Sequence, residues 1–63
     1  MDSEVMVHIV FNVHAVGQSI HAVFGDELLA LREAHKPELP RGVKRRVIES
    51  YPADKALAIV GSA

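Results

Sequence analysis

The chain of 63 residues contains no cysteine and no tryptophan, and only three of its residues are aromatic. Without cysteine it has neither disulfides nor thiolate metal ligands, which often supplement the core of a small protein. A domain of this length buries only about 60% of the surface that its unfolded chain exposes. We therefore expect a single small domain over residues 1–63, frayed at 1–3 and 61–63, that depends on apolar packing.

Long apolar runs are also missing. No stretch approaches the roughly 18 residues of a membrane helix. Asp2 and Glu4 are acidic where an export signal would be basic, so we expect a cytoplasmic protein with no membrane partner. The four glycines are too scattered for a phosphate-binding loop, and no serine lies in a nucleophile-elbow motif. We expect a protein that is not an enzyme and has no cofactor.

The clearest periodicity lies in the first third of the chain. Apolar residues alternate along residues 4–16, and a shorter alternating row covers residues 20–24. A period of two is typical of strands with one face in a core. A type II′ turn at residues 17–18, with positive φ at the glycine, would join the rows into a hairpin. Phe11 would then face Phe24.

The alternative for residues 19–36 is one long helix, because apolar residues there also recur at spacings of three and four. Gly25 opposes it, since glycine inside a helix costs about 1 kcal/mol relative to alanine. Asp26 suits the cap of a new helix. We favour the hairpin, followed by a helix over 27–35 that ends before Pro37. The residues of this helix expected to face the core are Leu28, Leu31 and His35.

Residues 43–51 fit either a strand or a short helix. We favour a strand, because helix formers are few and Gly42 and Pro52 flank the segment. The apolar run ALAIV at 56–60 predicts a last strand. The predicted fold class is α+β, a small antiparallel sheet in the order ββαββ with one helix packed on it. The alternatives are βαββ, with the long helix at 19–36, and a helical 43–51.

The net charge of −1 conceals an asymmetry. Between Lys36 and the end of the cluster at Arg46 there are five basic residues and one acidic residue. Such a segment can bind an acidic protein surface or the phosphates of a nucleic acid. With Tyr51 as the only aromatic residue nearby, stacking on bases has little support. The cations that form this candidate partner-binding segment are Arg41, Lys44, Arg45 and Arg46.

Two other groups lie on the outer face of the first predicted strand. Met6 and Val10 make this face too apolar for solvent, which predicts packing against a second copy or a partner, with cover by the C-terminal segment of the same chain as the alternative. His14 and His21 would lie about 4.5–5.5 Å apart across the hairpin. Imidazoles can hold divalent metals, but a structural zinc site needs four ligands. We therefore expect no metal site and keep the two histidines as weak candidates.

These patterns favour a small intracellular regulatory module that binds a protein partner and self-associates as a homo-oligomer. Met6, Val10 and the basic segment 41–46 would form its binding surface. The alternative is a nucleic-acid-binding regulator that uses the same basic segment. A third hypothesis is a metal-binding protein that uses His14 and His21.

Overall fold

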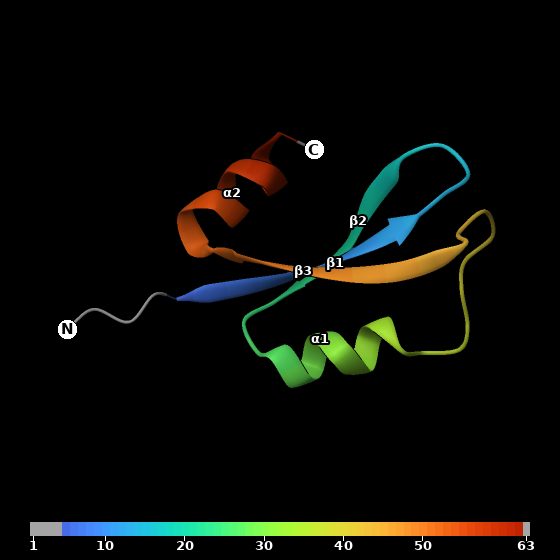
Figure 1. The fold of residues 1–63 in the computed structure, drawn as a ribbon, viewed down its shortest axis with the longest axis horizontal. Coiled ribbons are helices and arrows are strands. Elements are labelled where there is room, and N and C mark those ends of the chain that lie inside the picture. Colours follow the sequence, from blue (N-terminus) through green and yellow to red (C-terminus); the bar gives the residue numbers. More distant parts are fainter. Residues whose placement is uncertain (1–4, 63) are drawn as a thin grey trace.

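The computed structural model describes residues 5–62 (Figure 1). Its elements are, in chain order, β1 (Met6–Val13), β2 (Gln18–Phe24), α1 (Glu27–Ala34), β3 (Arg45–Pro52) and α2 (Ala53–Gly61). The strands form one antiparallel sheet in the order β2-β1-β3. The predicted α+β class and antiparallel sheet are confirmed, and so is the strand within 43–51. The order of elements is ββαβα, so the predicted ββαββ is wrong in its last element.

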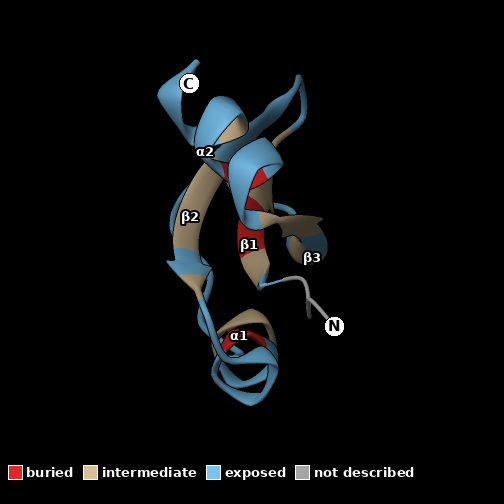
Figure 2. Ribbon diagram, turned by 90° about the vertical axis from the view of Figure 1, so that its left-hand side faces the viewer, coloured by how far each residue is buried: buried red, intermediate tan, exposed pale blue. Residues whose placement is uncertain are grey.

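The two helices lie on opposite faces of the sheet, with β1 between them (Figures 1 and 2). Successive side chains of a strand point to opposite faces. Ile9 and Phe11 of β1 therefore point to the α2 side, where they form the core with Ala56. Val10 points to the α1 side, where Ala30 of the helix is also buried. As the central strand, β1 is thus buried on both faces.

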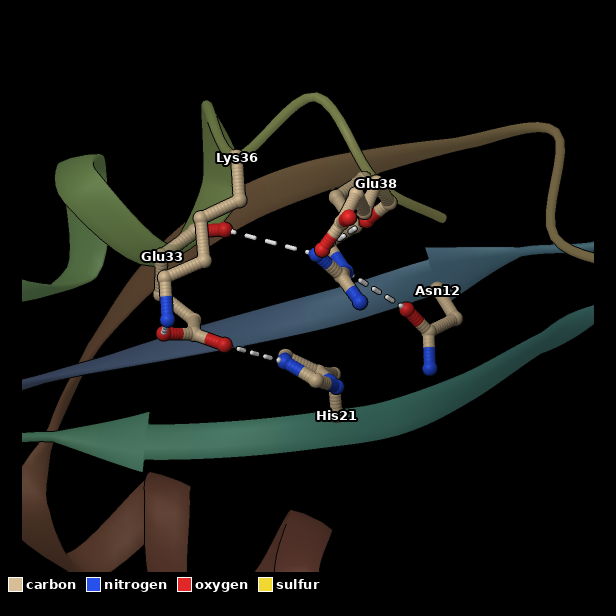
Figure 3. Close-up of polar contacts among 6 residues, drawn as sticks. Asn12, His21, Glu33, Lys36 and Glu38 are labelled. Carbon is tan, nitrogen blue, oxygen red and sulfur yellow. Dashed lines mark hydrogen bonds and ion pairs between the residues drawn. The ribbon is translucent and has the colours of Figure 1, made fainter. Parts of the chain in front are cut away.

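The pairing of β1 with β2 contains a β-bulge. Phe11 lies opposite Ile20, whereas its neighbour Val10 lies opposite Ala22. His21, between Ile20 and Ala22, therefore has no partner residue on β1. A bulge bends its strand and redirects the side chains beside it. Here the side chain of His21 lies on the α1 side of the sheet (Figure 3).

The predicted hairpin is confirmed, but its turn and register differ from the prediction. The turn occupies residues 14–17 and is closed by a bond of 3.0 Å from the His14 N–H to the Gly17 carbonyl. Gly17 has a φ of 83°, the positive value that the prediction required. Phe24 lies opposite His8, so the predicted pairing of Phe11 with Phe24 is wrong. The turn is centred on residues 15–16 instead of 17–18, which shifts the register. The bulge then moves the partner of Phe24 back by one residue, to His8.

The long helix at 19–36 is also wrong, because β2 occupies its first third, residues 19–24. Helix α1 begins after Asp26, whose carboxylate accepts a bond of 2.8 Å from the Leu28 N–H. Its buried side chain is Ala30. A small residue at this position lets the helix lie close to the sheet. The residues that were predicted to face the core, and that are exposed instead, are Leu28, Leu31 and His35.

The predicted strand at 56–60 is a helix, α2. Alanine and leucine favour helices, and an apolar run of five residues is too short for periodicity to decide. Ala56 and Ile59, three positions apart, pack against the core from one side of α2. Gly61 is the last residue of α2 and Ser62 is its C-cap, while the fraying of 61–63 stays a prediction. Residues 1–3 and 63 lie outside the described residues.

Candidate functional site

The apolar surface predicted on β1 does not exist as an exposed face. Val10 is 0% exposed, and Met6 is half-buried. Helix α1 covers this face of the strand (Figure 2). The prediction that Val10 lies on an accessible partner surface is therefore wrong, because the chain supplies the cover itself.

The four cations of the basic segment do not form one surface. Arg41 and Lys44 are exposed in the connector between α1 and β3. Arg45 and Arg46 are successive residues of β3, so their side chains point to opposite faces of the sheet. Arg45 is exposed, whereas Arg46 is half-buried on the α1 side. Binding of a protein or a nucleic acid through Arg41, Lys44 and Arg45 stays a prediction, but Arg46 has a partner set within the chain.

Arg46 joins β3 to β1 and to the end of α1. Figure 3 labels its partners Asn12, Glu33 and Glu38. Its Nε donates to Asn12 Oδ1 at 3.0 Å. Its Nη1 donates to the carbonyl oxygens of Glu33, at 3.5 Å, and of Glu38, at 3.4 Å. The last carbonyls of a helix lack partners within it, and a cation there is favourable. Arg46 therefore has a structural role.

The Glu33 carboxylate links α1 to the bulge of β2 (Figure 3). It accepts a hydrogen bond from His21 Nε2 at 2.8 Å and pairs with Lys36 Nζ at 2.9 Å. These two bonds, that of His21 first, lower the pKa of Glu33 to about 2. None of the six residues drawn has a hydroxyl or thiol that could act as a nucleophile. The cluster fixes α1 on the sheet.

The two histidines that the sequence placed face to face have separate partners. His21 binds Glu33, whereas His14 Nε2 lies 2.7 Å from Ser19 Oγ and its Nδ1 lies 3.2 Å from the Gly42 carbonyl. The predicted pairing of His14 with His21 is wrong for the same reason as that of the phenylalanines. Within residues 5–62, no three histidine or carboxylate side chains are placed to hold a metal ion together.

An apolar groove lies between α2 and the strands β1 and β2. Its volume is about 300 Å³. Helix α2 packs mainly over β1 and β3, so the same face of β2 stays uncovered beside it. Strand residues form the floor and α2 forms one wall. The residues that line the groove are Val7, Val23, Ala53, Ala56, Leu57 and Val60.

The groove presents a second apolar stripe of α2, next to the one in the core. Among its large side chains Leu57 is the most exposed, at 74%, with Val23 of the floor at 45% and Val60 at 40%. A helix that is apolar on more than one side is usually buried on more than one side. No titratable residue lines the groove, so it is suited to binding an apolar surface. A strand at 56–60 does not predict this groove, whereas helical spacing from Ala53 to Val60 shows both apolar stripes.

Comparison with protein-family models, with curated proteins and with solved structures finds no match for this chain. Among residues 5–62, no helix is long and apolar enough to cross a lipid bilayer. A function for this chain must therefore be inferred from its own surfaces.

Proposed function

We propose that this protein is a small interaction module that binds an amphipathic helix of a protein partner in the groove between α2 and β2. The observation that carries the proposal is the apolar lining of the groove, with Leu57 74% exposed at its wall. Large apolar side chains exposed side by side, without charges among them, mark interaction sites. The mechanism would be occlusion, because the module would cover the apolar face of its partner.

The shape of the groove favours a helix as the occupant. Neighbouring strands lie about 4.8 Å apart, so a three-stranded sheet is about 10 Å wide between its outer strands. A helix with its side chains has about the same width, so a helix centred on the sheet would cover all three strands, whereas a displaced helix leaves one strand uncovered. Since α2 lies mainly over β1 and β3, a second helix fits beside it over β2, at the usual helix–helix distance of about 8–10 Å.

The wall of the groove also has the spacing that helices use for packing. Ala53, Leu57 and Val60 follow one another at intervals of four and three, which places them in one apolar stripe along α2. Helices that bind in grooves present anchors at the same intervals. An apolar cavity of about 150 Å³ can hold benzene, so a groove of about 300 Å³ accommodates about two large side chains. The partner helix should therefore carry at least two large apolar anchors.

The proposal can be tested with a phage-displayed library of helical peptides selected on the immobilised protein. Leu57 and Leu28 form a matched pair, because they are 74% and 70% exposed and lie on helices at opposite faces of the sheet. We expect Leu57→Lys to weaken binding of the selected peptides at least about tenfold, since a charge would enter an apolar contact. Leu28→Lys should leave their affinity unchanged.

Chemical-shift mapping with one selected peptide shows where it binds. The proposal requires the methyl resonances of Val7, Val23 and Val60 to shift. Equal losses in both lysine variants, or shifts confined to the α1 face, would refute the groove as the binding site. A peptide bound in extended form along the edge of β2 would replace the helix by a strand as the occupant.

A further inference from the structure

Strand β3 leaves one side of its backbone unpaired. It is an edge strand, with β1 on its inner side only. The Ala53 N–H donates to the Val5 carbonyl at 3.0 Å, in the register of the β1–β3 ladder. Because hydrogen-bonded pairs alternate along an antiparallel ladder, the backbone groups of Arg46, Ile48 and Ser50 point outward. Among residues 5–62, no other backbone group pairs with them.

Strand β3 carries two side chains of opposite charge, one on either side of Val47. Arg45 and Glu49 are both exposed, share the α2 face of the sheet and flank Val47 at equal distances in sequence. Four residues of strand span about 13 Å, so the two side chains are too far apart to pair with each other. The ion pairs of the described residues are both made by Glu33. Glu49 accepts a hydrogen bond from the Tyr51 hydroxyl, and within residues 5–62 it forms no ion pair with a cation.

We propose that β3 pairs with the β3 strand of a second copy, antiparallel about a two-fold axis at Val47. Arg45 of each copy then lies directly opposite Glu49 of the other. Val47 packs against its own counterpart, and the outward backbone groups of Arg46 and Ile48 bond across the axis. The product is one continuous six-stranded sheet with both α2 helices on the same face.

The charges select this register over its neighbours. An axis at Arg46 would place two arginines against each other, and an axis at Glu49 would do the same with two glutamates. Like charges directly opposite are destabilising, and opposite charges are stabilising. An axis at Ile48 leaves Glu49 opposite Val47 and pairs no charges. With the axis at Val47, the charged pairs fall at non-hydrogen-bonded positions, where side chains of facing strands are closest.

The two edges of the sheet differ in a way that favours β3. The β2 edge is interrupted by the bulge at His21, and bulges protect edges from pairing. Strand β3 pairs with β1 without a bulge over all of Arg45–Pro52. The core is also small, since Ile9 and Val10 are the large side chains that are fully buried in it. Chains below about 70 residues commonly gain stability from oligomerisation.

The test uses charge reversals, followed by analytical ultracentrifugation at low salt. Arg45→Glu places two glutamates opposite each other at both ends of the interface, and Glu49→Arg does the same with arginines. Each single variant should therefore raise the dimer dissociation constant by about tenfold or more. A mixture of the two variants should form heterodimers, and the double variant should dimerise like the parent. A structural role of either residue would not produce this rescue.

A second measurement needs no variant. A sample mixed from ¹³C-labelled and unlabelled parent should show an intermolecular contact between the Val47 methyl groups. A parent that sediments as a monomer at several hundred micromolar overturns the proposal, as does a double variant that fails to recover. The groove lies on the β2 side and does not enter this interface. A dimer broken by Leu57→Lys but not by Arg45→Glu would likewise refute it.

Discussion

Replacing Val10 by alanine tests the central feature of the fold, a strand with both faces buried. Val10 is 0% exposed on the α1 side of β1. Val16, in the hairpin turn, is 93% exposed. Val16→Ala is therefore a matched control, because it makes the same chemical change at a site that contacts solvent. If α1 did not cover β1, the two substitutions would have similar effects.

The expected magnitude follows from the atoms removed. Valine to alanine deletes two carbons, and each buried methylene contributes about 0.8 kcal/mol. The cavity that remains adds to this loss, so Val10→Ala should reduce the free energy of unfolding by about 2–3 kcal/mol. A domain of this size has about 3–5 kcal/mol in total. At the middle of both ranges, about 4 kcal/mol less about 2.5 kcal/mol, the variant keeps about 1.5 kcal/mol and stays mostly folded at 25 °C.

Urea denaturation followed by circular dichroism measures the difference. At a slope of about 1 kcal/mol per molar urea, the midpoint should fall by about 2–3 M for Val10→Ala. Val16→Ala should stay within about 0.5 kcal/mol of the parent. Equal midpoints for the two variants would refute the burial of Val10 under α1. They would instead favour the exposed outer face that the sequence predicted.

Two further predictions concern the cluster between α1 and the sheet. The lowered pKa of Glu33, about 2 against 4.5 for the free side chain, contributes stability that is complete above pH 4.5 and lost as the pH falls towards 2. Glu33→Gln should therefore flatten this part of the stability–pH curve, and an unchanged curve would contradict the bond to His21. Arg46→Met should cost about 1–3 kcal/mol in urea unfolding, whereas Arg41→Met, on an exposed cation, should change stability by less than about 0.5 kcal/mol.

The sequence predicted those features of the fold that depend on a local signal. Alternation over residues 4–16 predicted β1, and Gly25 with Asp26 predicted both the end of β2 and the start of α1. The positive φ of Gly17 was also predicted correctly, although for a turn at 17–18 rather than the one at 14–17. These features depend on neighbours in sequence, so no knowledge of the tertiary structure was needed.

The remaining features depend on distant contacts. The outer row of β1 was recognised as too apolar for solvent, but nothing local showed that α1 would cover it. The bulge at His21 shifts the register by one residue, and its side chain then meets Glu33 on α1. Short apolar runs such as residues 56–60 carry too little periodicity to separate a strand from a helix. A strand at 56–60 leaves no wall for the candidate groove, so the groove could not be predicted from the sequence.

The two proposed surfaces lie at opposite edges of one small sheet, and this arrangement has a consequence for binding. The groove lies on the β2 side, and the pairing edge is β3. A two-fold axis perpendicular to the sheet keeps both α2 helices on one face, so a dimer would present two grooves on that face, at its outer ends. Two linked sites bind a bivalent partner more tightly than either site alone, if the partner's spacing matches theirs. Self-association through β3 would therefore increase the affinity of the module for a partner with two apolar helices, without any change in the groove itself.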